Sequence, residues 1–166
     1  MKYMETPMGT LILDADDNGI TRVAFAADSL PLEGKVDRAK RETDEVVSSN
    51  SPLLDEAERQ LREYFDGARR TFDLPLSLRG TPFQLSVWAA LREIPYGETR
   101  TYGDIARRVG VPGGARAVGM ANNRNPISII IPCHRVIGAS GSLVGYGGGL
   151  DRKAYLLRLE GLIVPD

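Results

Sequence analysis

Residues 101–122 read TYGDIARRVGVPGGARAVGMAN, and they predict two short helices joined by a tight turn. Thr101 is a favoured N-cap residue, and the first helix is expected to end just before Gly110. After the turn, the second helix runs from about Gly114 to Asn122. This spacing is typical of a helix-turn-helix, although any helical hairpin can show it.

Small side chains dominate the second of these helices, and a single arginine stands among them. The small residues are Ala115, Ala117, Gly119 and Ala121, and the cation is Arg116. In one interpretation the helix is buried against its neighbours and Arg116 points to solvent. In the other, the helix approaches nucleic acid closely and Arg116 reaches into it. The composition of the helix leaves both interpretations open.

A further helix is expected before this pair. Thr81-Pro82-Phe83-Gln84 is a capping box with proline at the first helical position, and the apolar periodicity continues to about Glu93. The second half of the chain is therefore predicted to be mostly helical.

Short strands and one amphipathic helix are expected in the first half. The predicted strands are Lys2–Glu5, Leu11–Ala15 and Ile20–Ala26, and Asn18-Gly19 is a hairpin signal. Residues 28–50 are polar and irregular, so we expect a loop or a weak strand there. Ser51-Pro52 opens the helix, which ends before Gly67.

These elements predict an α+β chain with two domains. Residues 1–79 would form a small antiparallel sheet with a helix, and residues 80–166 a mostly helical domain like a winged helix-turn-helix. The first part holds 11 Lys+Arg against 16 Asp+Glu, whereas the second holds 10 against 6, a net charge of +4. A basic half of this kind favours a polyanion as partner.

The composition excludes several classes of protein. The 166 residues include one cysteine and one histidine, so there is no internal disulfide and too few soft ligands for a structural zinc site. No apolar run approaches the roughly 20 residues that cross a bilayer, and the chain does not start like a signal peptide. We expect neither membrane insertion nor secretion.

The only cysteine and the only histidine are neighbours. The apolar run Ile127–Ile131 predicts a buried strand, and Pro132, Cys133 and His134 follow it. A lone cysteine is usually a small buried hydrophobic residue. Beside a histidine at the exit of a strand, it is also a candidate nucleophile. On an extended chain the two side chains would point apart, so His134 reaches Cys133 only if the backbone bends.

Glu160 is the carboxylate that could orient such a histidine. It lies in the last turn of a helix that we expect to be capped by Asp151 and ended by Gly161. A negative charge at this end of a helix interacts unfavourably with the helix dipole, at a cost in stability of about 0.3–1 kcal/mol. This placement indicates a cationic or hydrogen-bond-donating partner such as His134; otherwise Glu160 is a solvated surface residue.

Four glycines fall within the five residues 145–149. They allow backbone N–H groups to approach a flat ligand closely, so this segment is expected to form a pocket wall, with a plain flexible turn as the alternative. It is not a phosphate-binding loop, because the Lys-Ser/Thr pair of such loops is missing.

Taken together, these segments resemble the O6-alkylguanine-DNA alkyltransferases, also called methylated-DNA–protein-cysteine methyltransferases. The resemblance covers nearly all of residues 80–166 in order, whereas the first half matches only in size and in its strand-plus-helix character. The matching stretches are Phe83-Gln84 with Val87-Trp88, Ile94–Thr99, Ala115–Gly119, Asn125-Pro126, Ile131–Val136, Gly145-Tyr146 with Gly148-Gly149, and Leu156-Leu157 with Glu160-Gly161.

The resemblance implies a role for each matching residue. Cys133 would accept the alkyl group, His134 would act as general base through a bound water, and Glu160 would orient and polarise His134. Asn125 would hold the turn before the cysteine. The alkylated base would contact Tyr102, Val136, Tyr146, Gly147 and Lys153. Arg116 would replace the extruded nucleotide, and Ala115, Ala117, Gly119, Asn122 and Arg124 would also contact DNA.

The implied function is irreversible transfer of an alkyl group from O6 of guanine, and from O4 of thymine, to Cys133 after the nucleotide flips out through the minor groove. We expect no cofactor and no metal, duplex DNA as partner, a monomer, and a cytoplasmic location. The alternatives are a cysteine peptidase and a non-enzymatic lesion sensor or regulatory DNA-binding protein. Members of the superfamily that only sense lesions lack the cysteine, which is present here.

Overall fold

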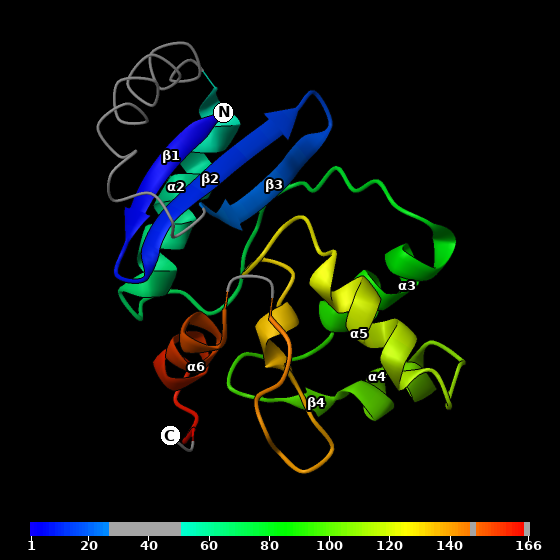
Figure 1. Ribbon diagram of the computed structural model, residues 1–166. Helices are drawn as coiled ribbons and strands as arrows, with labels where there is room; N and C mark the ends of the chain where they lie inside the picture. Colours follow the sequence, from blue (N-terminus) through cyan, green and yellow to red (C-terminus); the bar gives the residue numbers. More distant parts are fainter. Residues whose placement is uncertain (27–50, 147–148, 165–166) are drawn as a thin grey trace. The chain divides into compact units, whose positions relative to one another are not determined.

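The computed structural model describes residues 1–26, 51–146 and 149–164 (Figure 1). It consists of two compact units, Met1–Ser77 and Leu78–Asp166. The prediction for residues 28–50 lies outside the described residues. None of the described helices is long and apolar enough to cross a membrane.

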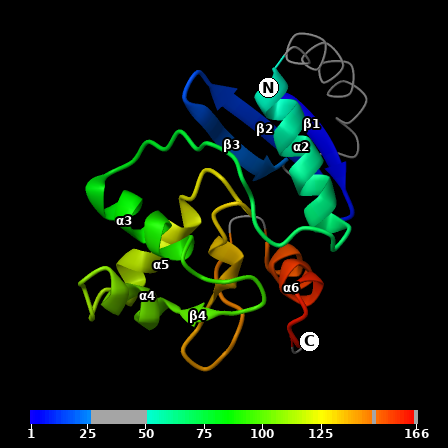
Figure 2. The same ribbon diagram turned by 180° about the vertical axis from the view of Figure 1, so that it is seen from behind.

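The first unit is a three-stranded antiparallel sheet with one helix against it. The strands β1 (Lys2–Thr6), β2 (Gly9–Asp16) and β3 (Gly19–Phe25) pair in the order β1-β2-β3. Helix α2 (Pro52–Phe65) lies along one face of this sheet (Figure 2). Side chains that the sheet and the helix bury completely form the core, among them Leu11, Leu13, Val23, Leu61 and Tyr64.

Local sequence signals explain how α2 begins and ends. The Ser51 hydroxyl accepts a hydrogen bond from the Leu54 backbone N–H at 3.3 Å, and proline occupies the first helical position. Gly67 follows the helix with φ of +79°, in the left-handed region that glycine adopts without strain. The predicted strands and the predicted helix of this half are confirmed.

The second unit is mostly helical. Its elements are α3 (Pro82–Leu91), β4 (Arg100–Thr101), α4 (Tyr102–Arg108), α5 (Ala115–Asn123), the 3₁₀ turn η1 (Cys133–Arg135), β5 (Val136–Ile137) and α6 (Leu150–Leu159). Helices α3, α4 and α5 pack against one another, and α4 and α5 are the predicted pair (Figure 1). Two of the predicted capping residues, Thr81 and Thr101, form complete capping boxes. The predicted α+β fold class is confirmed.

A short parallel sheet of two strands, each two residues long, joins the start of α4 to the segment after Cys133. Arg100 of β4 pairs with Val136 of β5, and Thr101 pairs with Ile137. Tyr102, which follows β4 directly, is therefore held close to the end of η1.

The predicted buried strand over Ile127–Ile131 is wrong. The segment is buried, but it turns back on itself, since the Ile131 N–H donates to the Ile127 carbonyl at 3.0 Å. Ile129 adopts φ of +73°, which is rare for a β-branched residue. The Asn125 amide spans the turn by accepting from the Ile127 N–H at 2.9 Å and donating to the Ile131 carbonyl at 2.8 Å. An apolar run signals burial but does not require an extended backbone.

The start of α6 also differs from the prediction. Gly149, with φ of +98°, occupies the N-cap position, and Asp151 lies inside the first turn. Glycine tolerates this backbone conformation, so the helix begins without a side-chain cap. Asp151 remains favourably placed near the positive end of the helix dipole.

Candidate active site

Cys133 and His134 lie on a single buried turn of 3₁₀ helix. The Cys133 N–H donates to the Ile131 carbonyl at 2.7 Å, so the backbone bends after Pro132. A 3₁₀ turn separates consecutive side chains by about 120° instead of directing them to opposite sides. Cys133 is 4% exposed and His134 is fully buried.

The imidazole of His134 is bound to the carboxylate of Glu160. His134 Nε2 lies 2.6 Å from Glu160 Oε2, and both side chains are completely shielded from solvent. The partner that the dipole argument predicts for Glu160 is therefore present. Arg135 is a second partner that the sequence analysis missed: its Nε donates to Glu160 Oε1 at 2.8 Å and its Nη2 to Oε2 at 3.0 Å.

The ionisation of this cluster follows from its contacts. Burial would raise the pKa of the Glu160 carboxyl, but hydrogen bonds and charge from His134 and Arg135 lower that pKa to about 2. Burial lowers the pKa of His134, and Glu160 opposes this effect only in part. We therefore assign an ionised Glu160 and a neutral His134 whose Nε2 carries the hydrogen. His134 Nδ1 is then an acceptor, and it has no hydrogen-bond partner among the described residues.

The Cys133 thiol is protonated in this resting arrangement. Burial raises its pKa, whereas a hydrogen bond from the Asn125 side chain and the charge of Lys153 act in the opposite direction. A thiolate is the reactive form of cysteine. The site thus needs a base that removes the thiol proton, and His134 Nδ1 is an acceptor on the neighbouring residue.

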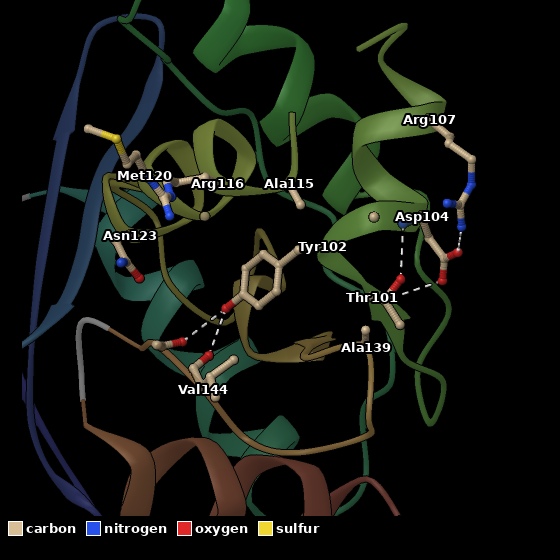
Figure 3. Close-up of a pocket in the computed structure, with 13 residues that line it drawn as sticks. Thr101, Tyr102, Asp104, Arg107, Ala115, Arg116, Met120, Asn123, Ala139 and Val144 are labelled. Atoms are coloured by element: carbon tan, nitrogen blue, oxygen red, sulfur yellow. Dashed lines mark hydrogen bonds and ion pairs between the residues drawn. The ribbon is translucent and has the colours of Figure 1, made fainter. Parts of the chain in front are cut away.

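Tyr102 and Lys153 converge on the same two backbone carbonyls. The Tyr102 hydroxyl lies 2.7 Å from the Val144 carbonyl oxygen and 3.3 Å from that of Gly145 (Figure 3). Lys153 Nζ donates to the same carbonyls, at 3.0 Å to Val144 and 3.2 Å to Gly145. Burial lowers the pKa of Lys153 to about 8. The segment around Val144 is therefore held by one side chain from α4 and another from α6.

Four of the five predicted base-contacting residues, Tyr102, Val136, Tyr146 and Lys153, lie in the described part of the chain. Burial raises the pKa of Tyr102 and Tyr146 and lowers that of Lys153, so each of these side chains is at least partly removed from solvent. Val136 directly follows η1 and is fully buried. Gly147 lies outside the described residues.

A groove of about 840 Å³ opens on the helix-turn-helix side of this cluster (Figure 3). It is bordered by α4, by α5 and by residues of the 139–145 segment, and Tyr102 points into it. The lining includes Ala115, Arg116, Gly119, Met120 and Asn123 of α5. Cys133 is not among the described residues that line it.

The six predicted DNA contacts separate into three groups. Ala115, Arg116 and Gly119 line the groove, whereas Ala117 and Arg124 are exposed outside it. Asn122 is only 2% exposed, and its amide donates to the Cys133 carbonyl at 3.4 Å. This buried side chain supports the turn that carries the cysteine, and its contact with DNA stays a prediction.

No group of three or more His, Cys, Asp or Glu side chains that could hold a metal ion occurs within the part of the chain that the structure describes. The cluster around Cys133 is thus built from one thiol, one imidazole, one carboxylate and two cationic side chains.

Two family models together match almost the whole chain. The "6-O-methylguanine DNA methyltransferase, ribonuclease-like domain" matches residues 1–78, and the "6-O-methylguanine DNA methyltransferase, DNA binding domain" matches residues 82–162. The first match ends one residue after the boundary of the two compact units, and the second begins at residue 82.

Individual relatives agree with these matches. The methylated-DNA–protein-cysteine methyltransferase of Methanosarcina acetivorans is 52% identical over 157 residues, which cover 95% of both chains. The constitutive enzyme of that name from Bacillus subtilis is 50% identical, and the alignment covers 94% of this chain and 92% of the relative.

Solved structures of relatives have the same fold. The crystal structure of Mycobacterium tuberculosis O6-methylguanine methyltransferase has a TM-score of 0.75 at 44% identity, and the match covers 96% of this chain and 90% of that one. M. tuberculosis OGT in complex with DNA also has a TM-score of 0.75, at 45% identity and with 96% and 91% coverage. The chain belongs to the 6-O-methylguanine DNA methyltransferase family.

Proposed function

We propose that the protein repairs DNA directly by moving an alkyl group from O6 of guanine to the sulfur of its own Cys133. The observation that carries this proposal is the buried chain of contacts from Arg135 through Glu160 to His134, next to the protein's only cysteine. It provides an uncharged acceptor nitrogen beside a thiol that must lose its proton.

In the proposed reaction, His134 Nδ1 takes the thiol proton, directly or through a water molecule. The sulfur then attacks the alkyl carbon, the bond between that carbon and O6 breaks, and its electron pair remains on guanine. A hydrogen-bond donor at the base edge or solvent supplies the proton that makes guanine neutral. The ionised Glu160 stabilises the imidazolium that forms.

The reaction consumes the protein. Its product is a thioether, which has no electrophilic carbonyl that water could attack. A cysteine peptidase differs at this point, since its thioester is hydrolysed and the thiol regenerated. We therefore propose one transfer event per molecule.

The groove beside α5 is the proposed DNA-binding surface. Ala115 and Gly119 allow the helix to approach a narrow groove of the duplex, and the exposed Arg116 can fill the gap that a flipped nucleotide leaves. A minor groove offers little sequence information, which suits repair of lesions at any position. The net charge of +4 on residues 80–166 supports a polyanion partner.

The thiol is shielded in the resting protein, so the base must displace part of the wall. We propose that this part is the segment at Val144 and Gly145, which hydrogen bonds of Tyr102 and Lys153 hold in place. We propose that these bonds break when a nucleotide enters, and that both side chains then become available to the base.

The first unit is proposed to support the second, because the candidate catalytic residues all lie after residue 80. The predicted boundary between the two domains, between residues 79 and 80, is kept as part of this proposal. Repair of O4-alkylthymine, a monomeric state and a cytoplasmic location are proposed with the same function.

The experiment that tests this function is a kinetic one. With a duplex containing O6-methylguanine in large excess, we expect repair to stop when the amount of repaired guanine equals the amount of protein. Repair that continues through many rounds on the same protein would contradict the proposal.

Arg116→Ala tests the proposed role of the groove. We expect about a tenfold slower transfer from a duplex and little change with free O6-benzylguanine, because only the duplex requires a nucleotide to be flipped. Arg92→Ala is the matched control, since it removes an exposed arginine of the same unit that does not line the groove. Equal losses on both substrates would place Arg116 in the base pocket instead.

A further inference from the structure

The proposed reaction steps give Arg135, the buried partner of Glu160, no role of its own. Arg135 is 6% exposed, and it lies next to the base of the reaction. We infer that Arg135 is a positioning residue that fixes the Glu160 carboxylate against the turn Ile94–Gly97 and so keeps His134 ready to accept a proton. This inference rests on the proposed function and adds a residue and a turn to its site.

All three nitrogens of the Arg135 guanidinium donate hydrogen bonds, and an aromatic ring lies nearby. Its Nε and Nη2 bind the two oxygens of Glu160, and its Nη1 donates to the Ile94 carbonyl at 2.7 Å. The guanidinium carbon also lies 5.7 Å from the centre of the Tyr96 ring, within range of a cation–π contact. Paired contacts of a planar guanidinium with a carboxylate fix orientation as well as charge.

Residues of the turn Ile94–Gly97 also donate hydrogen bonds to Glu160 and to the residue before it. The Gly97 N–H donates to Glu160 Oε1 at 3.2 Å, and the Tyr96 hydroxyl donates to the Leu159 carbonyl at 3.3 Å. Gly97 adopts φ of +80°, which a side chain would strain, and an added Cβ would lie 3.3 Å from the Glu160 carbonyl. The carboxylate is thus held by the turn, by Arg135 and by His134 together.

The charges that face His134 come from two elements. Arg135 and Cys133 flank it on η1, and Glu160 and Lys153 approach from α6. Glu160 raises the pKa of His134, whereas the positive charges of Arg135 and Lys153 lower it. Removing Arg135 would leave the imidazole as the nearest cation for Glu160, so protonated His134 would become more favourable and its acceptor nitrogen less available.

The test uses two variants of the full chain, Arg135→Met and Arg135→Lys. Because the protein has a single histidine, its ring signals in an NMR pH titration report on His134 alone. For Arg135→Met we expect the histidine titration to move to higher pH. We also expect a single-turnover transfer rate at neutral pH about 10- to 100-fold lower than wild type, recovering in part as the pH rises.

Arg135→Lys separates charge from geometry. Lysine keeps the positive charge but cannot bind both carboxylate oxygens in one plane. We expect a histidine titration close to that of the wild type and a transfer rate that stays lower at every pH. Arg108→Met is the matched control, because it removes an arginine from an exposed ion pair with Glu93. It should change neither measurement.

Free O6-benzylguanine serves as substrate, so that DNA binding does not enter the result. If the wild type transfers no alkyl group from this base or from an O6-methylguanine duplex, the proposed function fails. If the wild type is active and the Met variant has the same histidine titration and pH–rate profile, the positioning role of Arg135 fails alone. Should the Met variant not fold, the Lys variant decides: a reduced rate supports the inference, and a wild-type rate at all pH values contradicts it.

Discussion

Cys133→Ser should abolish alkyl transfer and leave DNA affinity nearly unchanged. The serine hydroxyl is a far weaker nucleophile than a thiol and forms its anion much less readily, so we expect the transfer rate to fall by more than about 10⁴-fold. Cys133 is not among the described residues that line the proposed DNA-binding groove, so affinity for a methylated duplex should stay within about threefold. Radiolabel transfer from the duplex and fluorescence anisotropy measure the two quantities.

Two results would contradict this expectation. A serine variant that still gains a methyl group would place the acceptor elsewhere. A folded serine variant that no longer binds the duplex would assign Cys133 a structural role in DNA binding. Circular dichroism of both proteins provides the control for folding.

Glu160→Gln should reduce both activity and stability. The amide cannot stabilise an imidazolium as a carboxylate does, so we expect a transfer rate about 10²- to 10⁴-fold lower. It also leaves the buried Arg135 without a counter-charge, and breaking a buried ion pair in this way costs about 3–5 kcal/mol in the free energy of unfolding. Single-turnover kinetics and urea unfolding measure these losses.

The pH dependence of unfolding gives a second check on Glu160. Its pKa is lowered in the folded protein from 4.5 to about 2, so the ionised carboxylate stabilises the fold at pH values above 4.5. This contribution is lost as the pH falls from 4.5 towards 2. The difference in stability between wild type and Glu160→Gln should therefore shrink over this range.

The matched control for Glu160 is Glu98→Gln, which breaks an ion pair with Arg100 that is largely exposed. We expect it to change stability by less than about 1 kcal/mol and to leave transfer unchanged. Equal stability losses in the two variants would mean that the Glu160 contacts contribute no more than a surface pair.

Structural features that depend on only a few neighbouring residues, such as helix starts, can be predicted from the sequence. Three helix starts were predicted correctly, because a capping side chain and the backbone groups that it binds lie within one turn. They are the capping boxes at Thr81 and Thr101 and the Ser51-Pro52 pair. The run Ile127–Ile131 was misread because hydrophobicity reports burial, whereas the Asn125 amide decides the path of the backbone.

The candidate site was predicted in part, for a similar reason. The unfavourable position of Glu160 at a helix end pointed to a partner, and His134 is that partner. Arg135 and the turn Ile94–Gly97 were missed as members of the site, since their contacts join segments 41 and 63 residues apart. Arg135 directly follows His134, so its place on the same short turn was the one signal that could have indicated its role.

The central claim is that the sulfur of Cys133 becomes the final carrier of the alkyl group. The most direct measurement is the intact mass of the protein after reaction with an O6-methylguanine duplex, followed by peptide mapping. The account predicts a gain of one methyl group per molecule, located on Cys133 alone. Loss of the methyl group from the duplex without any gain by Cys133 would contradict it.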